Sequence, residues 1–110
     1  MNRSLIVVQM KPKMFCSIRV HWNYGQEIED WLNNLNLSEI HSLIGEGHRS
    51  TIAESYRSLL CNDCNCNHWT HKTLREAIYS CKTLREAIYN CEHMTLAYHN
   101  GKKWKFTHNN

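Results

Sequence analysis

Apolar and polar residues alternate with two different periods along the chain, and the change of period predicts its elements. Residues 5–10 and 15–22 are rich in β-branched and aromatic side chains, and the link Lys11-Pro12-Lys13 between them holds the only proline. This arrangement predicts a β-hairpin. Because side chains alternate along a strand, the second run should have a core face and a basic face. The expected core face contains Cys16, Ile18, Val20 and Trp22, and the expected basic face contains Ser17, Arg19 and His21.

The period of a helix follows in residues 26–60. Apolar residues recur at i, i+3, i+4 and i+7 from Ile28 to Leu35, which predicts an amphipathic helix over 26–36. A short second helix is expected to be capped by Ser38 and to stop at Gly45-Glu46-Gly47. A third helix is expected from Thr51, because Thr51 and Glu54 have the spacing of a capping box and an apolar stripe follows as far as residue 60.

A stretch of ten residues is repeated in tandem further on. Residues 72–81 and 82–91 are identical except at Ser80 and Asn90. Solenoid repeats are longer and more numerous, so we interpret this pair as a local duplication. Its content of Leu, Ala, Glu and Arg favours one long helix, in which the second copy is rotated by roughly 80° from the first. Apolar side chains then surround much of the helix, which predicts a central position.

A second hairpin is expected at residues 94–108, because Asn100-Gly101 favours a two-residue type I′ turn. The residues expected to face inward are Met94, Leu96, Tyr98, Trp104 and Phe106, with Lys103, Lys105 and Thr107 on the opposite face. The whole pattern predicts an α+β fold. The N-terminal and C-terminal hairpins, which can share one sheet, pack on a helical middle that includes the long duplicated helix.

Size and composition predict a single globular domain over residues 1–110. The chain is 42% hydrophobic and 10% aromatic, which is enough to form a packed core. Its longest apolar stretch near the start is too short for a signal peptide or a membrane span, so we expect a cytoplasmic protein that does not associate with membranes. In the reducing cytosol the six cysteines are expected to be free thiols or metal ligands and not disulfides.

The net charge of +3 is distributed unevenly. Residues 1–25 and 94–110 contain basic residues and no acid, whereas residues 26–63 contain seven acids. If the two hairpins share a sheet, the basic side chains expected to converge on its open face are Arg19, His21, His99, Lys103 and Lys105. Cations on a sheet neutralise phosphates and nearby aromatic rings stack on bases, so nucleic acid or an acidic protein surface is the expected partner. Lysines on terminal strands also prevent edge-to-edge aggregation, which is the alternative explanation.

Five potential metal ligands occur within eleven residues: Cys61, Cys64, Cys66, His68 and His71. A Cys-x-x-Cys pair in a turn is the usual first half of a zinc site, so zinc is the one cofactor that the sequence suggests. A second pair at an accepted spacing is missing. The alternative is therefore a polar loop with unliganded thiols and no cofactor.

Two local resemblances to known families accompany these patterns. Residues 28–44, from Ile28-Glu-Asp-Trp31-Leu32 to Leu43-Ile44, together with Lys72-Thr-Leu74-Arg-Glu-Ala-Ile78, resemble the opening and closing helices of a SAM domain. That resemblance implies an all-helical fold and association with other proteins, although the cysteine-rich loop and the two hairpins have no counterpart there. The stretch Leu60-Cys-Asn-Asp-Cys64-Asn resembles the first knuckle of some zinc ribbons.

No local signature of catalysis is present: the chain has no glycine-rich phosphate loop, no paired-carboxylate motif and no nucleophile motif. We assign no catalytic residue and expect a non-catalytic binding module, suited to inhibiting or regulating a larger machine. Three alternatives stay open: a zinc-supported interaction domain, a SAM-like interaction domain, and a small hydrolase or nuclease whose catalytic groups meet only in space.

Overall fold

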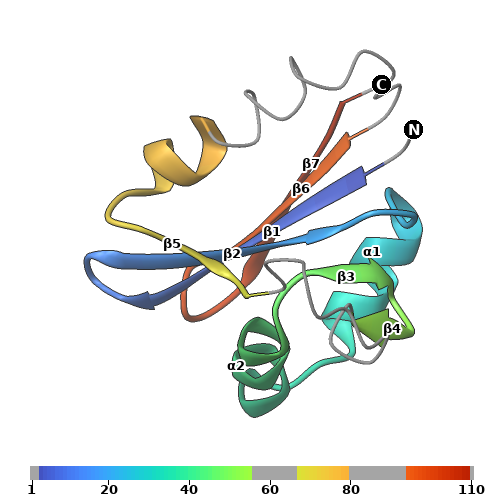
Figure 1. Ribbon diagram of the computed structural model, residues 1–110, viewed down its shortest axis with the longest axis horizontal. Helices are drawn as coiled ribbons and strands as arrows, with labels where there is room; N and C mark the ends of the chain where they lie inside the picture. The colour runs from blue at the N-terminus through green and yellow to red at the C-terminus, as the bar shows by residue number, and fades with distance from the viewer. Residues whose placement is uncertain (1–2, 56–66, 80–93, 110) are drawn as a thin grey trace.

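The computed structural model describes residues 3–55, 67–79 and 94–109, and Figure 1 shows their arrangement. Its strands form one mixed sheet in the order β4-β3-β2-β1-β6-β7, with β5 paired to β2. The strands are β1 (Arg3–Lys11), β2 (Met14–Val20), β3 (Arg49–Thr51), β4 (Glu54–Ser55), β5 (Trp69–His71), β6 (Met94–His99) and β7 (Trp104–Asn109). The mixed α+β class is confirmed. Both predicted hairpins are present, and they share the sheet because β1 and β6 pair in parallel.

Helices α1 (Gln26–Asn33) and α2 (Leu37–Glu46) are found close to their predicted positions, but the cap of α2 differs from the prediction. Its N-cap is Asn36 and not Ser38. The Asn36 side chain accepts the N–H of Glu39 at 2.8 Å, and the Glu39 carboxylate accepts the N–H of Asn36 at 3.0 Å. This reciprocal pair satisfies two backbone donors, which a serine two residues later does not do. The helix ends at Gly47 (φ 80), within the predicted glycine segment.

The third predicted helix is wrong in its first part, because residues 51–55 form a β-hairpin between β3 and β4. Thr51 pairs with Glu54 across this hairpin. The Thr51 hydroxyl accepts the N–H of Ala53 at 3.2 Å, which is a contact of a turn and not of a helix cap. The rest of that predicted helix lies outside the described residues.

The two faces of the sheet carry separate cores, and helices lie on both sides of it in Figure 1. One face packs Ile6 and Ile18 against α1 and α2, which contribute Ile28 and Ile44 among their buried side chains. The opposite face was expected to be open, but Trp69, Leu74 and Ala77 cover part of it. Residues 74–79 are helical, as the first copy of the duplication predicts, while the second copy lies outside the described residues. The sheet also excludes the all-helical SAM fold.

Two predicted core positions are corrected by the strand register. Trp22 was expected to face inward, but it lies beyond the end of β2 and is 60% exposed. Trp104 pairs with His99 and Phe106 with Ala97, so both rings face α1 and α2. The other face of the same hairpin holds Met94, Leu96 and Tyr98 together with Lys105 and Thr107. The predicted face was wrong because even-numbered residues of β6 pair with odd-numbered residues of β7, so Tyr98 and Trp104 cannot lie on the same face of the hairpin.

In the part of the chain that the structure describes, no helix has the length and apolar character needed to cross a membrane.

Candidate functional site

Arg19, predicted to lie on an open basic face, is packed beneath an aromatic ring. Its guanidinium carbon lies 4.7 Å from the centroid of the Trp69 ring. The imidazole of His48 meets the same indole edge-to-face at 4.8 Å, and its Nδ1 accepts the backbone N–H of Arg19 at 3.0 Å. Trp69 reaches this position because β5 pairs with β2. We call Arg19, His48 and Trp69 the buried basic cluster.

Burial keeps the imidazoles of this region neutral. The side chain of His48 is 1% exposed, and burial, followed by the charge of Arg19, lowers its pKa to about 4. The pKa of His21 is lowered by burial and by the charges of Arg3 and Arg19. Proton uptake at this end is therefore disfavoured at neutral pH.

His99 does not join Arg19, because it faces the opposite side of the sheet. It is 5% exposed, and its ring lies 4.9 Å from that of Trp104. Its Nδ1 accepts the N–H of Gly101 at 3.1 Å, which leaves the proton of the neutral imidazole on Nε2. Burial, followed by the charge of His41, lowers its pKa. Arg19 and His99 therefore do not converge on one open face of the sheet, as the sequence predicted.

Lys103 and Lys105 instead belong to a different cationic surface. Because β1 and β6 run in parallel, the turn that follows β1 and the turn that follows β6 lie at the same end of the sheet, on the left in Figure 1. The exposed lysines of this end are Lys11, Lys13, Lys102, Lys103 and Lys105. We call these five residues the lysine end. Arg19 and His21 lie near the other end, since Arg19 pairs with Leu5 early in β1.

The positive charge of the lysine end is not neutralised by neighbouring side chains. Among residues 3–55, 67–79 and 94–109, no carboxylate forms an ion pair with any of its five ammonium groups. Lys72 follows β5 at the same end, where the Glu76 carboxylate accepts its backbone N–H at 3.1 Å, so we do not count Lys72 with the five lysines. Strands lie about 4.8 Å apart, so the five charges span roughly 14 Å from β2 to β7.

The turn that carries Lys102 and Lys103 has a defined backbone. The Asn100 side chain accepts the N–H groups of Lys102 at 2.9 Å and Lys103 at 3.0 Å. Gly101 adopts φ 96, a value that side chains other than glycine rarely allow. Asn100-Gly101 therefore does form a turn, although not the predicted type I′ turn, and it holds the two lysine backbones in place.

A cavity of about 390 Å³ adjoins this turn. Its residues come from the end of α1, from the link between α1 and α2, from α2 itself and from the hairpin β6–β7. They are Asn33, Leu35, Leu37, Ile40, His99, Gly101, Lys102, Lys103 and Trp104. The cavity therefore combines apolar side chains from the helices with two cations from the turn. Chemically, the lysine end with its cavity can bind an anion that carries an apolar group.

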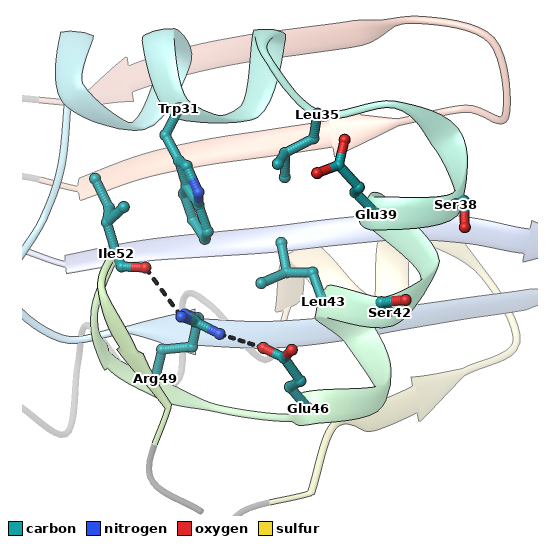
Figure 2. Close-up of a pocket in the computed structure, with 9 residues that line it drawn as sticks. All are labelled: Trp31, Leu35, Ser38, Glu39, Ser42, Leu43, Glu46, Arg49 and Ile52. Carbon is teal, nitrogen blue, oxygen red and sulfur yellow. Dashed lines mark hydrogen bonds and ion pairs between the residues drawn. The ribbon is translucent and has the colours of Figure 1, made fainter. Parts of the chain in front are cut away.

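A second cavity, of about 280 Å³, lies between α1, α2 and β3 and is shown in Figure 2. Its cation, Arg49, is fully engaged: it donates to Glu46 at 2.6 Å, to the carbonyl of Ile52 at 2.9 Å and to that of Thr51 at 3.3 Å. The guanidinium also lies over the Trp31 ring at 5.5 Å. Arg49 thus holds these elements together and is not available to a ligand.

A hydroxyl, an imidazole and a carboxylate lie in series where α1 meets the hairpin β6–β7. Thr95 Oγ1 lies 3.1 Å from His108 Nδ1, and His108 Nε2 lies 2.7 Å from a Glu29 oxygen. This is the order of groups in a hydrolase triad. However, Thr95 is 1% exposed and its hydroxyl also accepts the N–H of Gly25 at 2.6 Å. The network therefore fastens α1 to the sheet through the Gly25 N–H and the Glu29 carboxylate.

The proposed zinc ligands are only partly described. Cys61, Cys64 and Cys66 lie outside the described residues. His71 Nε2 lies 3.1 Å from the Ser17 hydroxyl, and His68 is close enough to His48 to lower its pKa. Within the described ranges no three His, Cys, Asp or Glu side chains are grouped to hold a metal ion. A zinc site that includes the cysteines stays a prediction.

Comparison with known proteins gives no relative: no family model, curated protein or solved structure matches the chain.

The sequence indicated Lys103 and Lys105, but Lys11, Lys13 and Lys102 were not assigned to the site. Part of their signal was present, since Lys11 and Lys13 lie in the predicted link of the first hairpin and Lys102 directly follows the predicted turn Asn100-Gly101 of the second. The sequence did not predict the parallel pairing of β1 with β6, which brings the two turns to the same end of the sheet.

Proposed function

We propose that the protein is a non-catalytic module that binds the phosphate backbone of nucleic acid through its lysine end. The observation that carries this proposal is the meeting of two turns at one end of the sheet, where five exposed ammonium groups have no acidic partner among the described residues. A small module that covers phosphates without processing them would act by obstructing a larger machine that uses the same nucleic acid.

The chemistry of the five side chains favours sequence-independent contacts. Lysine acts as a point charge, whereas arginine provides the fork that reads guanine edges or grips a carboxylate. Each neutralised phosphate releases condensed counterions, so affinity falls as salt rises. If all five lysines contact phosphates, the slope of log K against log salt concentration is about −4.5 for duplex DNA and about −3.5 for a single strand.

A salt titration with paired variants tests the proposal. Binding to a labelled oligonucleotide is measured by fluorescence anisotropy between about 50 and 200 mM salt, the range in which phosphate contacts are most evident. The variants Lys11→Ala with Lys13→Ala, and Lys102→Ala with Lys103→Ala, should each make the slope less steep by about 1.8 on duplex DNA.

The matched control lowers the net charge equally at the other end of the molecule. Gln26→Glu with Ala53→Glu changes two exposed positions, at the start of α1 and in the turn between β3 and β4. This control should leave the slope unchanged. If the control loses as much affinity as the lysine variants, the net charge of the protein and not the lysine end determines binding. Binding that does not depend on salt concentration would refute the proposal.

A further inference from the structure

We infer that the preferred nucleic acid is single-stranded, and that one unpaired nucleobase enters the cavity of about 390 Å³ beside the lysine end. This inference rests on the proposed function and specifies its ligand. It follows from how the cavity and the cations share residues.

The cavity and the phosphate-binding lysines are parts of one structure. Lys102 and Lys103 line the cavity and also belong to the lysine end. A phosphate held by these ammonium groups would therefore place its own or the next base at the cavity. A duplex cannot supply that base, because its bases are paired and stacked inside the helix, whereas single strands offer unstacked bases to apolar and aromatic side chains.

The polarity of the cavity fits a neutral, flat group. Leu37, Ile40 and Trp104 contribute apolar surface, and Leu37 is 49% exposed, so part of this surface is open to solvent. The volume lies in the lower part of the range for small-molecule sites, about 300–1,000 Å³. His99 lines the same cavity as a neutral imidazole, because burial lowers its pKa. In the described part of the chain, the only charged side chains that line the cavity are thus the two lysines. Their ammonium groups can bind the phosphate, and the apolar side chains can contact the base.

An acidic peptide is the other anionic partner to consider. Lysine is a point charge that serves carboxylates and phosphates alike, but the cavity lined by Lys102 and Lys103 also offers apolar surface, which the short side chains of Asp and Glu do not fill. Evenly repeated phosphates carrying flat bases therefore agree better with this surface than do acidic side chains.

The test compares strands of equal length with and without bases, and compares both with a duplex and with an acidic polypeptide. Binding is measured for a twelve-nucleotide oligothymidylate, an abasic strand of the same length, a duplex of the same length and polyglutamate. The oligothymidylate should bind roughly tenfold more tightly than the abasic strand, which is the order expected for contacts to one base. Leu37→Ser, at an exposed position of the cavity, should remove most of that preference and leave the affinity for the abasic strand unchanged.

Trp22→Ser is the matched control, because Trp22 is an exposed apolar side chain outside the cavity. It should keep the preference for bases. Equal affinity of the natural protein for the oligothymidylate and the abasic strand would overturn the inference but not the proposed binding of phosphates. The same holds if Trp22→Ser loses the preference for strands with bases and Leu37→Ser keeps it. Tighter binding of polyglutamate than of every strand, or no binding of any strand, would refute the proposed function itself.

Discussion

The two basic regions of this protein illustrate how differently the same residue types can be used. In the buried basic cluster, Arg19 is stacked under Trp69 and bonded through its backbone to His48. At the lysine end, by contrast, the ammonium groups are exposed and have no acidic partner among the described residues. The side chains that cover a cation thus decide whether it stabilises the fold or remains available to a ligand.

The difference has a simple physical origin. Burial favours the neutral form of a titratable group, so it lowers the pKa of the histidines near Arg19 and disfavours their charged form. Exposed lysines keep both their charge and their counterions, and the release of counterions drives binding to phosphates. Stability should therefore depend on the cluster, and affinity on the lysine end.

The largest expected effect is on stability and comes from removing the cover of the cluster. Trp69→Ala should lower the free energy of unfolding by about 3 kcal/mol, because it removes a large, partly buried ring that contacts both Arg19 and His48. Denaturant titration measures this loss. The affinity for an oligonucleotide, measured below the unfolding transition, should change less than twofold; a tenfold change would show that the two regions are not separate.

Acid should weaken the fold through His48. Its folded pKa of about 4 is below the ordinary value of 6.5, so the unfolded state binds the proton more readily between these two values. The contribution of neutral His48 to the free energy of unfolding is fully present above pH 6.5. It decreases by about 2–3 kcal/mol as the pH falls towards 4.

Unfolding measured at several pH values tests this, with His48→Asn as the comparison. The Asn oxygen can accept the Arg19 N–H but does not titrate, so the variant should show a shallower decline from pH 6.5 to 4. The same slope in both proteins would assign the acid sensitivity to other groups, such as His21. The affinity for an oligonucleotide should stay nearly constant from pH 8 to 6.5.

The lysine end should show the reverse behaviour. Lys102→Ala with Lys103→Ala should lower the affinity for an oligonucleotide at least tenfold at about 0.1 M salt, because two phosphate contacts are lost. The free energy of unfolding should change by less than about 0.5 kcal/mol, as is usual for exposed side chains. A clear loss of stability with unchanged affinity would reverse the roles of the two regions.

The smallest expected effect concerns the polar network of Thr95. Thr95→Val should cost about 1 kcal/mol, because the buried hydroxyl that accepts the Gly25 N–H is lost. Thr95→Ser, which keeps the hydroxyl, should lose less, and neither variant should alter the affinity for nucleic acid. Hydrolysis of a nitrophenyl ester by the natural protein, abolished in Thr95→Val, would contradict the structural role assigned to this network.

Local patterns were predicted best where neighbouring residues decide the conformation. The first hairpin and α1 follow directly from alternation and helical periodicity. Residues 51–55 were assigned wrongly because Thr51 and Glu54 satisfy a capping-box spacing, while pairing of Arg49 with Val20 draws the segment into the sheet. Contacts between distant segments overrode the local preference there.

The candidate site shows the same limit. The sequence by itself determined that lysines lie in or directly next to the turns of two hairpins, because turn chemistry and alternation act over a few residues. Only the tertiary structure decided which cations meet. Parallel pairing of β1 with β6 joined the two turns, and pairing of β5 with β2 placed Trp69 over Arg19. Strand order depends on backbone hydrogen bonds and burial between segments far apart in the chain, and no local pattern of side chains specifies it.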